Sequence, residues 1–269
     1  MGYWQQRVVL VTGGSGGLGR EIARAFGEAG ARVVIAARDE HKLAAAVEEL
    51  SVGDRQVVGI PADVTAANDV DALLAEVRRR FDRLDVLVNN VGRSVRQPIA
   101  ETSAEDVRDL MAINFLAAVR CTHAALDSLL NTGGHVVNIG SLAAKAVSPH
   151  LGAYPATKFA LAAYSAQLRQ ELGPQGLHVL LVCPGPLQRD DAGRRYNEQT
   201  SEMPDAARQA GAGVKLGAIS PAWLARKIVS ACERRRAEIV VPWRSRWLFA
   251  LSQLSPRWGD WVVEKMIRK

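Results

Sequence analysis

Short apolar runs rich in β-branched residues alternate along the chain with longer stretches in which apolar residues recur every three or four positions. The short runs are typical of buried strands, and the longer spacing is typical of amphipathic helices. Their regular alternation predicts a doubly wound α/β fold, with seven parallel strands covered by helices on both faces. The predicted strands are residues 8–12, 32–37, 57–61, 86–89, 135–139, 178–183 and 238–241, and the six predicted helices are 18–29, 41–50, 67–81, 104–130, 153–172 and 221–234.

Two segments do not follow this alternation. Residues 186–218 are rich in Gly, Asp, Gln and Arg and come after the carboxyl end of a strand, where open parallel sheets bind ligands. We expect them to form a loop that covers the substrate. The second segment, residues 242–269, is a tail rich in tryptophan and basic residues. A length of 269 residues with 48% hydrophobic content suits one domain, and we expect residues 1–269 to form it.

Cysteine content and the first residues indicate a reducing, cytoplasmic setting. Cys121, Cys183 and Cys232 are odd in number and widely spaced, which favours neither a disulfide framework nor a metal site. The first apolar run, residues 8–11, is too short for the core of a signal peptide, and no apolar stretch reaches the length of a membrane span. The net charge of +6 gathers late in the chain, but no nucleic-acid motif accompanies it, so we expect no nucleic-acid partner.

A glycine-rich stretch, residues 12–19, lies between the first predicted strand and the first predicted helix. In that position glycines let the backbone turn tightly and approach a pyrophosphate, which the free amides of the helix start can bind. The same composition also occurs in ordinary turns. The context therefore favours a dinucleotide site, with Gly13, Ser15, Gly17, Leu18 and Gly19 as its candidate residues.

The end of the second strand indicates which dinucleotide binds. A carboxylate there would hold a ribose 2′-hydroxyl, whereas this chain has Ala37 and then Arg38. A guanidinium can bind a 2′-phosphate, so we expect NADP(H) in preference to NAD(H), although Arg38 can also be a surface residue stacked on adenine. Asp63 and Val64, after the third strand, are candidates for the adenine end, and Asp63 can alternatively cap the next helix.

Four polar residues form a candidate catalytic group. Tyr154 and Lys158 are four positions apart in a predicted helix, so one face presents both, and a nearby ammonium favours the phenolate of the tyrosine. Ser141 follows the fifth strand, where its hydroxyl can bond a substrate oxygen. Asn114 lies within an apolar helical stretch, either distorting the helix and holding a water or simply satisfied as a buried amide. Taken singly, each residue has a structural explanation.

Together these residues resemble the short-chain dehydrogenase/reductase family over residues 8–242. The resemblance implies a Rossmann fold, and a hydride transfer between a nicotinamide and a carbonyl or alcohol carbon. It also implies a homodimer or homotetramer. The resemblance rests on Thr12-Gly-x-x-x-Gly17-x-Gly19, on Asn89-Asn90-Val91-Gly92, and on the order and spacing of Asn114, Ser141, Tyr154 and Lys158.

By this resemblance each residue acquires an expected role. Tyr154 is the acid/base, Lys158 lowers its pKa and binds the nicotinamide ribose, Ser141 steadies the substrate, and Asn114 holds a relay water. Asn90, Gly92, Pro184 and Gly185, with Tyr154 and Lys158, complete the expected cofactor site. Two positions depart from the family pattern: Val91 replaces an alanine, and Arg189 stands where a threonine often contacts the cofactor.

The sequence leaves two interpretations open for the contacts of the tail and two for the function of the chain. Tryptophans with basic neighbours suit a membrane interface and an apolar substrate, yet Pro256 breaks the run, which favours packing against the core or a partner subunit. A noncatalytic NADP-sensing protein would keep the same fold and nucleotide loop. It would need neither a proton donor nor the charge that supports it, so four filled catalytic positions favour an enzyme.

Overall fold

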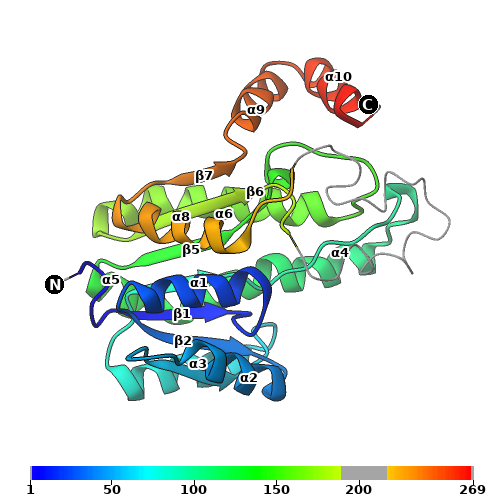
Figure 1. Cartoon of the computed structure of the whole chain (residues 1–269). Coiled ribbons are helices and arrows are strands. Elements are labelled where there is room, and N and C mark those ends of the chain that lie inside the picture. Colours follow the sequence, from blue (N-terminus) through cyan, green and yellow to red (C-terminus); the bar gives the residue numbers. More distant parts are fainter. Residues whose placement is uncertain (1, 189–216, 268–269) are drawn as a thin grey trace.

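All seven predicted strands are present and form one parallel sheet in the computed structural model, which describes residues 2–188 and 217–267 (Figure 1). The strand order is β3-β2-β1-β4-β5-β6-β7. Each neighbouring pair is parallel. The strands are β1 (Val8–Thr12), β2 (Arg32–Ala37), β3 (Val57–Pro61), β4 (Val86–Asn89), β5 (His135–Ile139), β6 (His178–Pro184) and β7 (Glu238–Val241).

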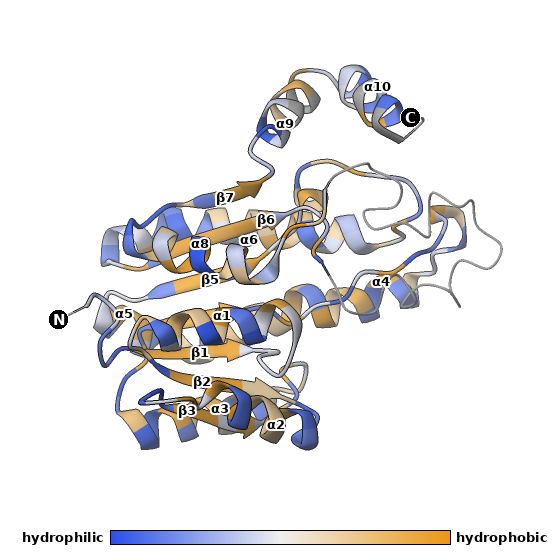
Figure 2. Ribbon diagram, viewed as in Figure 1, coloured by the Kyte–Doolittle hydropathy of each residue, from blue (hydrophilic) through white to orange (hydrophobic). Residues whose placement is uncertain are grey.

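Helices cover both faces of this sheet, as the alternation of the sequence predicts. In β1, Val9 and Val11 join one hydrophobic core, whereas Val8 and Leu10 join the core on the other face. Hydrophobic residues accordingly follow the strands in Figure 2. The doubly wound Rossmann fold is thereby confirmed. The first core contains residues of α1 (Gly17–Glu28), α2 (Glu40–Leu50) and α8 (Pro221–Glu233), and the second contains residues of α3 (Ala67–Phe81), α5 (Ala117–Thr132) and α6 (Tyr154–Leu172).

The prediction of one α-helix over residues 104–130 is wrong in its middle. The segment divides into α4 (Ala104–Met111), a π-helical turn η2 (Ala112–Leu116) and α5. The polar residue of this turn, Asn114, is only 1% exposed and bonds to other parts of the chain. Such turns often occur at functional sites, because the extra residue redirects side chains.

The tail forms two further helices, which the sequence pattern did not predict. These are α9 (Ser245–Leu254) and α10 (Pro256–Ile267), and Figure 1 shows them beyond the β7 edge of the sheet. The break between them falls at Pro256, as expected for a residue that starts a helix but cannot continue one. Within the described ranges, none of the helices combines the length and apolar character needed to span a membrane.

The predicted substrate-covering loop, 186–218, lies mostly outside the described residues, as does Arg189. Its two described ends pair with each other in parallel. The amide of Gln188 donates to the carbonyl oxygen of Ile219 at 2.9 Å, and the amide of Ile219 donates to that of Pro186 at 2.8 Å. Three short 3-10 turns complete the described structure: η1 (Ile99–Glu101), η3 (Leu142–Ala144) and η4 (Gly173–Gln175).

Candidate functional site

A cavity of about 1400 Å³ opens at the carboxyl ends of the strands. The chain leaves β1 toward β2 on one side, and β4 leads toward β5 on the other, so strand order reverses between β1 and β4. Open α/β sheets bind their ligands at such a reversal. Loops following β1, β2, β3, β4, β5 and β6 line the cavity.

The glycine-rich loop forms one wall of this cavity. Gly13 and Gly17 have positive φ angles of 65° and 51°, a conformation that side chains rarely adopt. At Gly19 an added Cβ would lie 2.3 Å from the carbonyl oxygen of Gly13, so only glycine allows α1 to approach the loop this closely. Gly16, the residue before α1, makes no side-chain cap to the helix start. Free backbone amides at the start of α1, next to glycine backbone that carries no side chains, can bind a pyrophosphate.

The predicted residues of this loop take different places. Gly13, Ser15, Gly17 and Leu18 line the cavity, whereas Gly19 lies behind it, against Gly13 and the Asn90 amide. A side-chain network connects this loop to the segment after β4. The Thr12 hydroxyl accepts from the Asn90 amide nitrogen at 3.0 Å, and Asn90 Nδ2 donates to the carbonyl oxygen of Thr12 at 3.1 Å.

Charged residues surround the end of the cavity beside β2. Arg38 is exposed, and its Nη1 lies 3.5 Å from Asp63 Oδ2. Asp63 Oδ1 also accepts from the Thr65 amide and hydroxyl, at 2.9 and 2.7 Å. One of its two carboxylate oxygens therefore bonds to the segment that leads into the next helix, as the capping alternative predicts. Burial opposes ionisation of Asp63, but the Thr65 bonds and Arg38 together lower the pKa of this carboxyl. Arg38, Asp63 and Val64 all line the cavity.

Asp39 is a carboxylate beside Arg38 that the sequence reasoning did not consider. It also lines the cavity. Its Oδ1 accepts from the backbone amide of Lys42 at 3.0 Å, which caps α2, and its Oδ2 lies 2.9 Å from Lys42 Nζ. The side chain is therefore engaged with its own helix start. Its signal in the sequence is an Asp immediately before a predicted helix, the ordinary position of an N-cap.

Tyr154, Lys158 and Ser141 line the same cavity. Tyr154 is the first residue of α6, and the Lys158 ammonium lies one turn later, 5.8 Å from the centre of the tyrosine ring. Lys158 Nζ donates to the carbonyl oxygen of Ile139, at the end of β5, at 2.8 Å. Burial lowers the pKa of Lys158 to about 8. Ser141 precedes η3, and its hydroxyl accepts from the Ala143 amide at 3.1 Å.

Asn114 lies behind the cavity wall rather than on it. Its Oδ1 accepts from the Arg93 amide at 2.8 Å, and its Nδ2 donates to the carbonyl oxygen of Arg93 at 2.9 Å and to the Thr157 hydroxyl at 3.0 Å. Gly92 brings this group close to Lys158, because a Cβ added there would lie 3.0 Å from Asn114 Oδ1 and 3.5 Å from Lys158 Nζ. Thr157, which the sequence analysis did not consider, accepts from Asn114 and donates to the carbonyl oxygen of Tyr154 at 2.7 Å. Its signal is a hydroxyl three residues after Tyr154 on the buried face of α6.

Apolar side chains form one wall of the cavity in its described portion, while Arg93, Ser94, Arg96 and Ser148 also line it. Pro184 and Gly185 line it, as predicted from their place after β6. Apolar side chains from η3 and from both tail helices complete this wall. The tail contribution was not foreseen, because only the fold brings α9 and α10 to the cavity. The apolar lining residues include Leu142, Ala146, Leu151, Phe249 and Val263.

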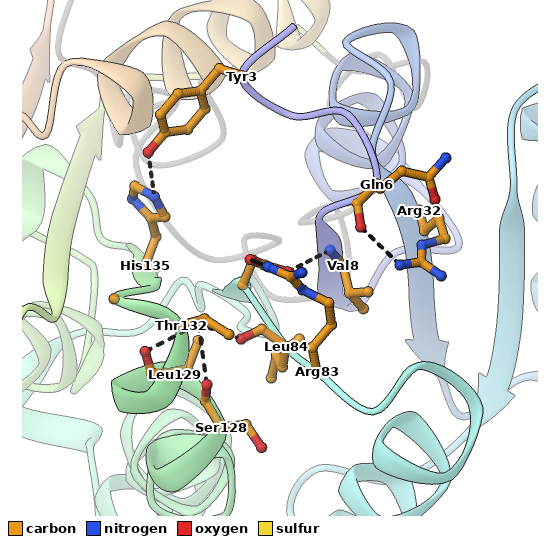
Figure 3. Close-up of polar contacts among 12 residues, drawn as sticks. Tyr3, Gln6, Val8, Arg32, Arg83, Leu84, Ser128, Leu129, Thr132 and His135 are labelled. Atoms are coloured by element: carbon orange, nitrogen blue, oxygen red, sulfur yellow. Dashed lines mark hydrogen bonds and ion pairs between the residues drawn. The ribbon is translucent and has the colours of Figure 1, made fainter. Parts of the chain in front are cut away.

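A second polar cluster lies at the amino ends of β5 and β6, away from the cavity. Ring nitrogens of His135 and His178 and the Cys232 sulfur lie within 4.8 Å of one another, a combination that metal ions can bind. With both rings neutral, a chain of hydrogen bonds already satisfies every ring nitrogen. The Tyr3 hydroxyl donates to His135 Nε2 (3.2 Å, Figure 3), His135 Nδ1 to His178 Nδ1 (2.8 Å), and His178 Nε2 to the carbonyl oxygen of Arg236 (2.9 Å). The sequence pattern did not indicate this cluster.

Comparison with known proteins places this site in context. Residues 7–200 match the family model described as short chain dehydrogenase. Among curated proteins, dehydrogenase/reductase SDR family member 7B of Danio rerio is 38% identical over 188 residues, which is 67% of this chain and 61% of that relative. The match thus spans less than two thirds of the relative's length.

Solved structures with nicotinamide cofactors share the fold. A short-chain dehydrogenase/reductase from Burkholderia phymatum in complex with NAD has a TM-score of 0.83 at 25% identity, covering 96% of each chain. Actinorhodin polyketide ketoreductase with NADPH has a TM-score of 0.79 at 30% identity, covering 90% of this chain and 97% of that one. One structure holds NAD and the other NADPH, so the comparisons support a nicotinamide cofactor of either kind.

Proposed function

This chain belongs to the short-chain dehydrogenase/reductase family, and from that premise we propose that it transfers a hydride between NADP(H) and a carbonyl or alcohol carbon of a small apolar molecule. The observation that carries the proposal is the convergence of Ser141, Tyr154 and Lys158 on the cavity that the glycine-rich loop also lines. A proton donor has no purpose in a protein that only binds its nucleotide.

The residues present fit a dinucleotide cofactor. Gly13, Ser15, Gly17 and Leu18 would hold the pyrophosphate against the start of α1, where bare backbone and uncapped amides meet. Gly19 keeps the helix close to the loop, and Asp63 and Val64 would border the adenine. Asn90, Gly92, Pro184 and Gly185 would flank the nicotinamide end. When bound, the nicotinamide supplies or accepts the hydride.

Tyr154 exchanges a proton with the substrate oxygen. In reduction the carbonyl carbon gains the hydride and the oxygen gains the phenol proton; oxidation reverses both transfers. Burial lowers the pKa of Lys158 to about 8, so at a lower pH its side chain is mainly an ammonium. This positive charge, one helical turn from Tyr154, favours the phenolate of Tyr154. The Ser141 hydroxyl donates a hydrogen bond to the substrate oxygen as negative charge develops there.

Asn114 acts on this reaction through its neighbours. It fixes the backbone of Arg93 and the hydroxyl of Thr157, which is the residue before Lys158. We propose that the π-helical turn around Asn114 leaves backbone oxygen available to hold a water that relays protons toward Lys158.

The preference for NADP(H) rests on the charges at the end of β2. Arg38 presents an exposed guanidinium to the cavity, and the only carboxylate next to it in the chain, Asp39, is held as the cap of α2. A 2′-phosphate would therefore meet a cation rather than a free carboxylate.

Substrate class, assembly and compartment complete the proposal. The apolar wall formed by η3 and the tail favours a lipophilic molecule over a sugar or an amino acid.

The family resemblance supports a homodimer or homotetramer. Three cysteines that are buried and free of disulfides suit a reducing cytoplasm.

The test is a screen of NADPH oxidation against ketones, quinones, oxoacyl thioesters and steroids, with NADH in parallel. We expect turnover of at least one apolar carbonyl compound, faster with NADPH. A protein that binds NADPH tightly but turns over none of these classes in either direction would instead be a nucleotide-sensing protein on the same fold.

A further inference from the structure

The outward side of α9 carries a continuous apolar stripe. Trp247, Leu251 and Leu254 follow one another at intervals of four and three residues, so they share one face of the helix. Trp247 is 68% exposed and Leu254 is 76% exposed. Ser245 and Phe249 are buried on the opposite side of the helix. This helix therefore presents apolar side chains both to the protein and away from it.

The second tail helix continues the stripe. Trp258 and Trp261 lie three residues apart on α10, and both are more than half exposed. Lys265 lies one turn further on, with its Nζ 4.0 Å from the centre of the Trp261 ring. The other side of α10 holds the buried Gly259 and Val263, which lines the cavity. We call the outward set the aromatic face; it consists of Trp243, Trp247, Leu251, Leu254, Trp258 and Trp261.

The charges around the aromatic face have one predominant sign. Arg244 and Arg246 lie on either side of the α9 stripe, and Arg257 and Lys265 accompany the tryptophans of α10. Residues 242–269 contain six basic and two acidic residues. Exposed tryptophans between basic residues match the interface of an anionic bilayer, where the rings lie among the headgroups and the cations meet lipid phosphates and carboxylates.

A second copy of this chain suits the face less well. A symmetric pair brings the same patch of both copies together, so the basic residues of one copy would oppose those of the other. Interface cores between proteins are also depleted in charge, whereas here basic residues border the stripe along both helices. The chemistry of the face therefore favours lipid over a second chain.

We propose that the aromatic face docks on the surface of an anionic phospholipid bilayer. The two helices that carry it also line the cavity from their inner side, through Phe249 and Val263. Docking would thus place the apolar end of the cavity next to the bilayer, from which an apolar substrate can enter. Only this last step rests on the proposed function, since bilayer binding requires neither cofactor nor turnover.

The experiment is cosedimentation of the full chain with vesicles of phosphatidylserine and phosphatidylcholine in equal parts, and with vesicles of phosphatidylcholine alone. We expect binding to the anionic vesicles at low salt, weakened about tenfold or more at an ionic strength of about 0.5 M. Trp247→Glu and Trp258→Glu should each weaken the binding by about tenfold or more, because each removes an aromatic ring from the interface. The double variant Arg244→Gln/Arg257→Gln should weaken it on anionic vesicles alone.

Two control variants match these changes elsewhere on the surface. Val52→Glu alters an apolar residue that is 59% exposed and lies two residues after α2, and Arg226→Gln removes an exposed arginine from α8. Both should bind vesicles like the unaltered protein, and circular dichroism should show all variants folded. Full-length protein that stays unbound at low salt overturns the proposal. The proposal is also overturned if the tail pairs two copies of the chain instead. In that case the unaltered protein would not bind vesicles, and its molecular mass in solution would be halved by Trp247→Glu.

Discussion

The side-chain amide of Asn114 pairs with the backbone of Arg93 as one peptide group pairs with another: its oxygen accepts from the Arg93 amide and its nitrogen donates to the Arg93 carbonyl. The segment after β4 is thereby fixed to the π-helical turn. Because Gly92 lies between this pairing and Lys158, the contact also sets one border of the cavity.

Replacing Asn114 by alanine should destabilise the protein by about 1–3 kcal/mol, since two partly buried backbone groups of Arg93 and the buried Thr157 hydroxyl lose their partner. Urea denaturation measures the loss. Thr157→Val should cost less, because Nδ2 of Asn114 keeps its bond to Arg93. The matched control is Asn131→Ala, an exposed amide in α5, which should change stability by no more than about 0.5 kcal/mol. Equal losses at Asn114 and Asn131 would contradict the structural role of the pairing.

Gly19→Ala should destabilise the protein by about 1–3 kcal/mol and weaken NADPH binding, because the new Cβ would lie 2.3 Å from the Gly13 carbonyl oxygen and 2.5 Å from Asn90 Nδ2. Gly16→Ala is the control within the same loop. No atom lies within 4 Å of a Cβ there, and its φ of −169° suits any residue. Thermal unfolding without cofactor should separate the two variants; equal stability would refute the close approach of α1 to the loop.

Arg38→Gln should weaken NADPH binding by about tenfold or more and leave NADH binding nearly unchanged, since only NADPH carries the 2′-phosphate. Fluorescence titration of both cofactors gives the ratio. Arg226→Gln, on α8 and away from the cavity, controls for the loss of a positive charge. An unaltered ratio in Arg38→Gln would assign phosphate recognition to another residue, with Lys42, which also lines the cavity, as the next candidate.

The buried histidine pair should make the protein labile in acid. Burial, with the charges of His178, Arg235 and Arg7, lowers the pKa of His135 to about 3, and burial also lowers that of His178. Between the unfolded pKa of about 6.5 and the folded pKa of about 3, the unfolded chain binds more protons than the native one. Stability therefore falls as pH decreases through this window, by about 1.4 kcal/mol for each unit of pKa shift.

Urea denaturation at several pH values tests this linkage. His178→Gln should be less stable near pH 7, because the hydrogen-bond chain is interrupted, but its stability should depend less steeply on pH below about 6.5. His123→Gln, an exposed histidine in α5, should retain the original pH dependence. A His178→Gln protein with an unchanged slope would show that the pair does not carry the effect.

The sequence was sufficient to predict the fold, and most of the candidate residues that it indicated line the cavity. All seven strands appear near their predicted ends because each is a short apolar run, most of them fully buried, and β6 is longer by a single residue, Pro184. The glycine loop and the Tyr154–Lys158 pair could be placed because one is set by a strand-to-helix turn and the other by one turn of helix.

Features that depend on contacts between distant segments could not be predicted. A distortion of the helix at Asn114 was one of two sequence interpretations, but the π-helical turn forms where Asn114 bonds to Arg93, 21 residues earlier in the chain, and the pattern does not report that contact. His135 and His178 meet because β5 and β6 are neighbours in the sheet, and periodicity does not report side-chain partners across strands. Phe249 and Val263 reach the cavity through the packing of the tail, whose helical pattern was obscured by apolar residues on both sides of α9.

The most direct test of the proposed chemistry is the rate of hydride transfer in Tyr154→Phe, measured in a single turnover with NADPH and a carbonyl substrate identified by the screen. The phenylalanine ring keeps the packing but has no proton to give, so we expect the rate to fall by about a hundredfold or more while the affinity for NADPH stays within about twofold. A Tyr154→Phe protein that transfers hydride at nearly the original rate would contradict the account, because the proton would then come from another group.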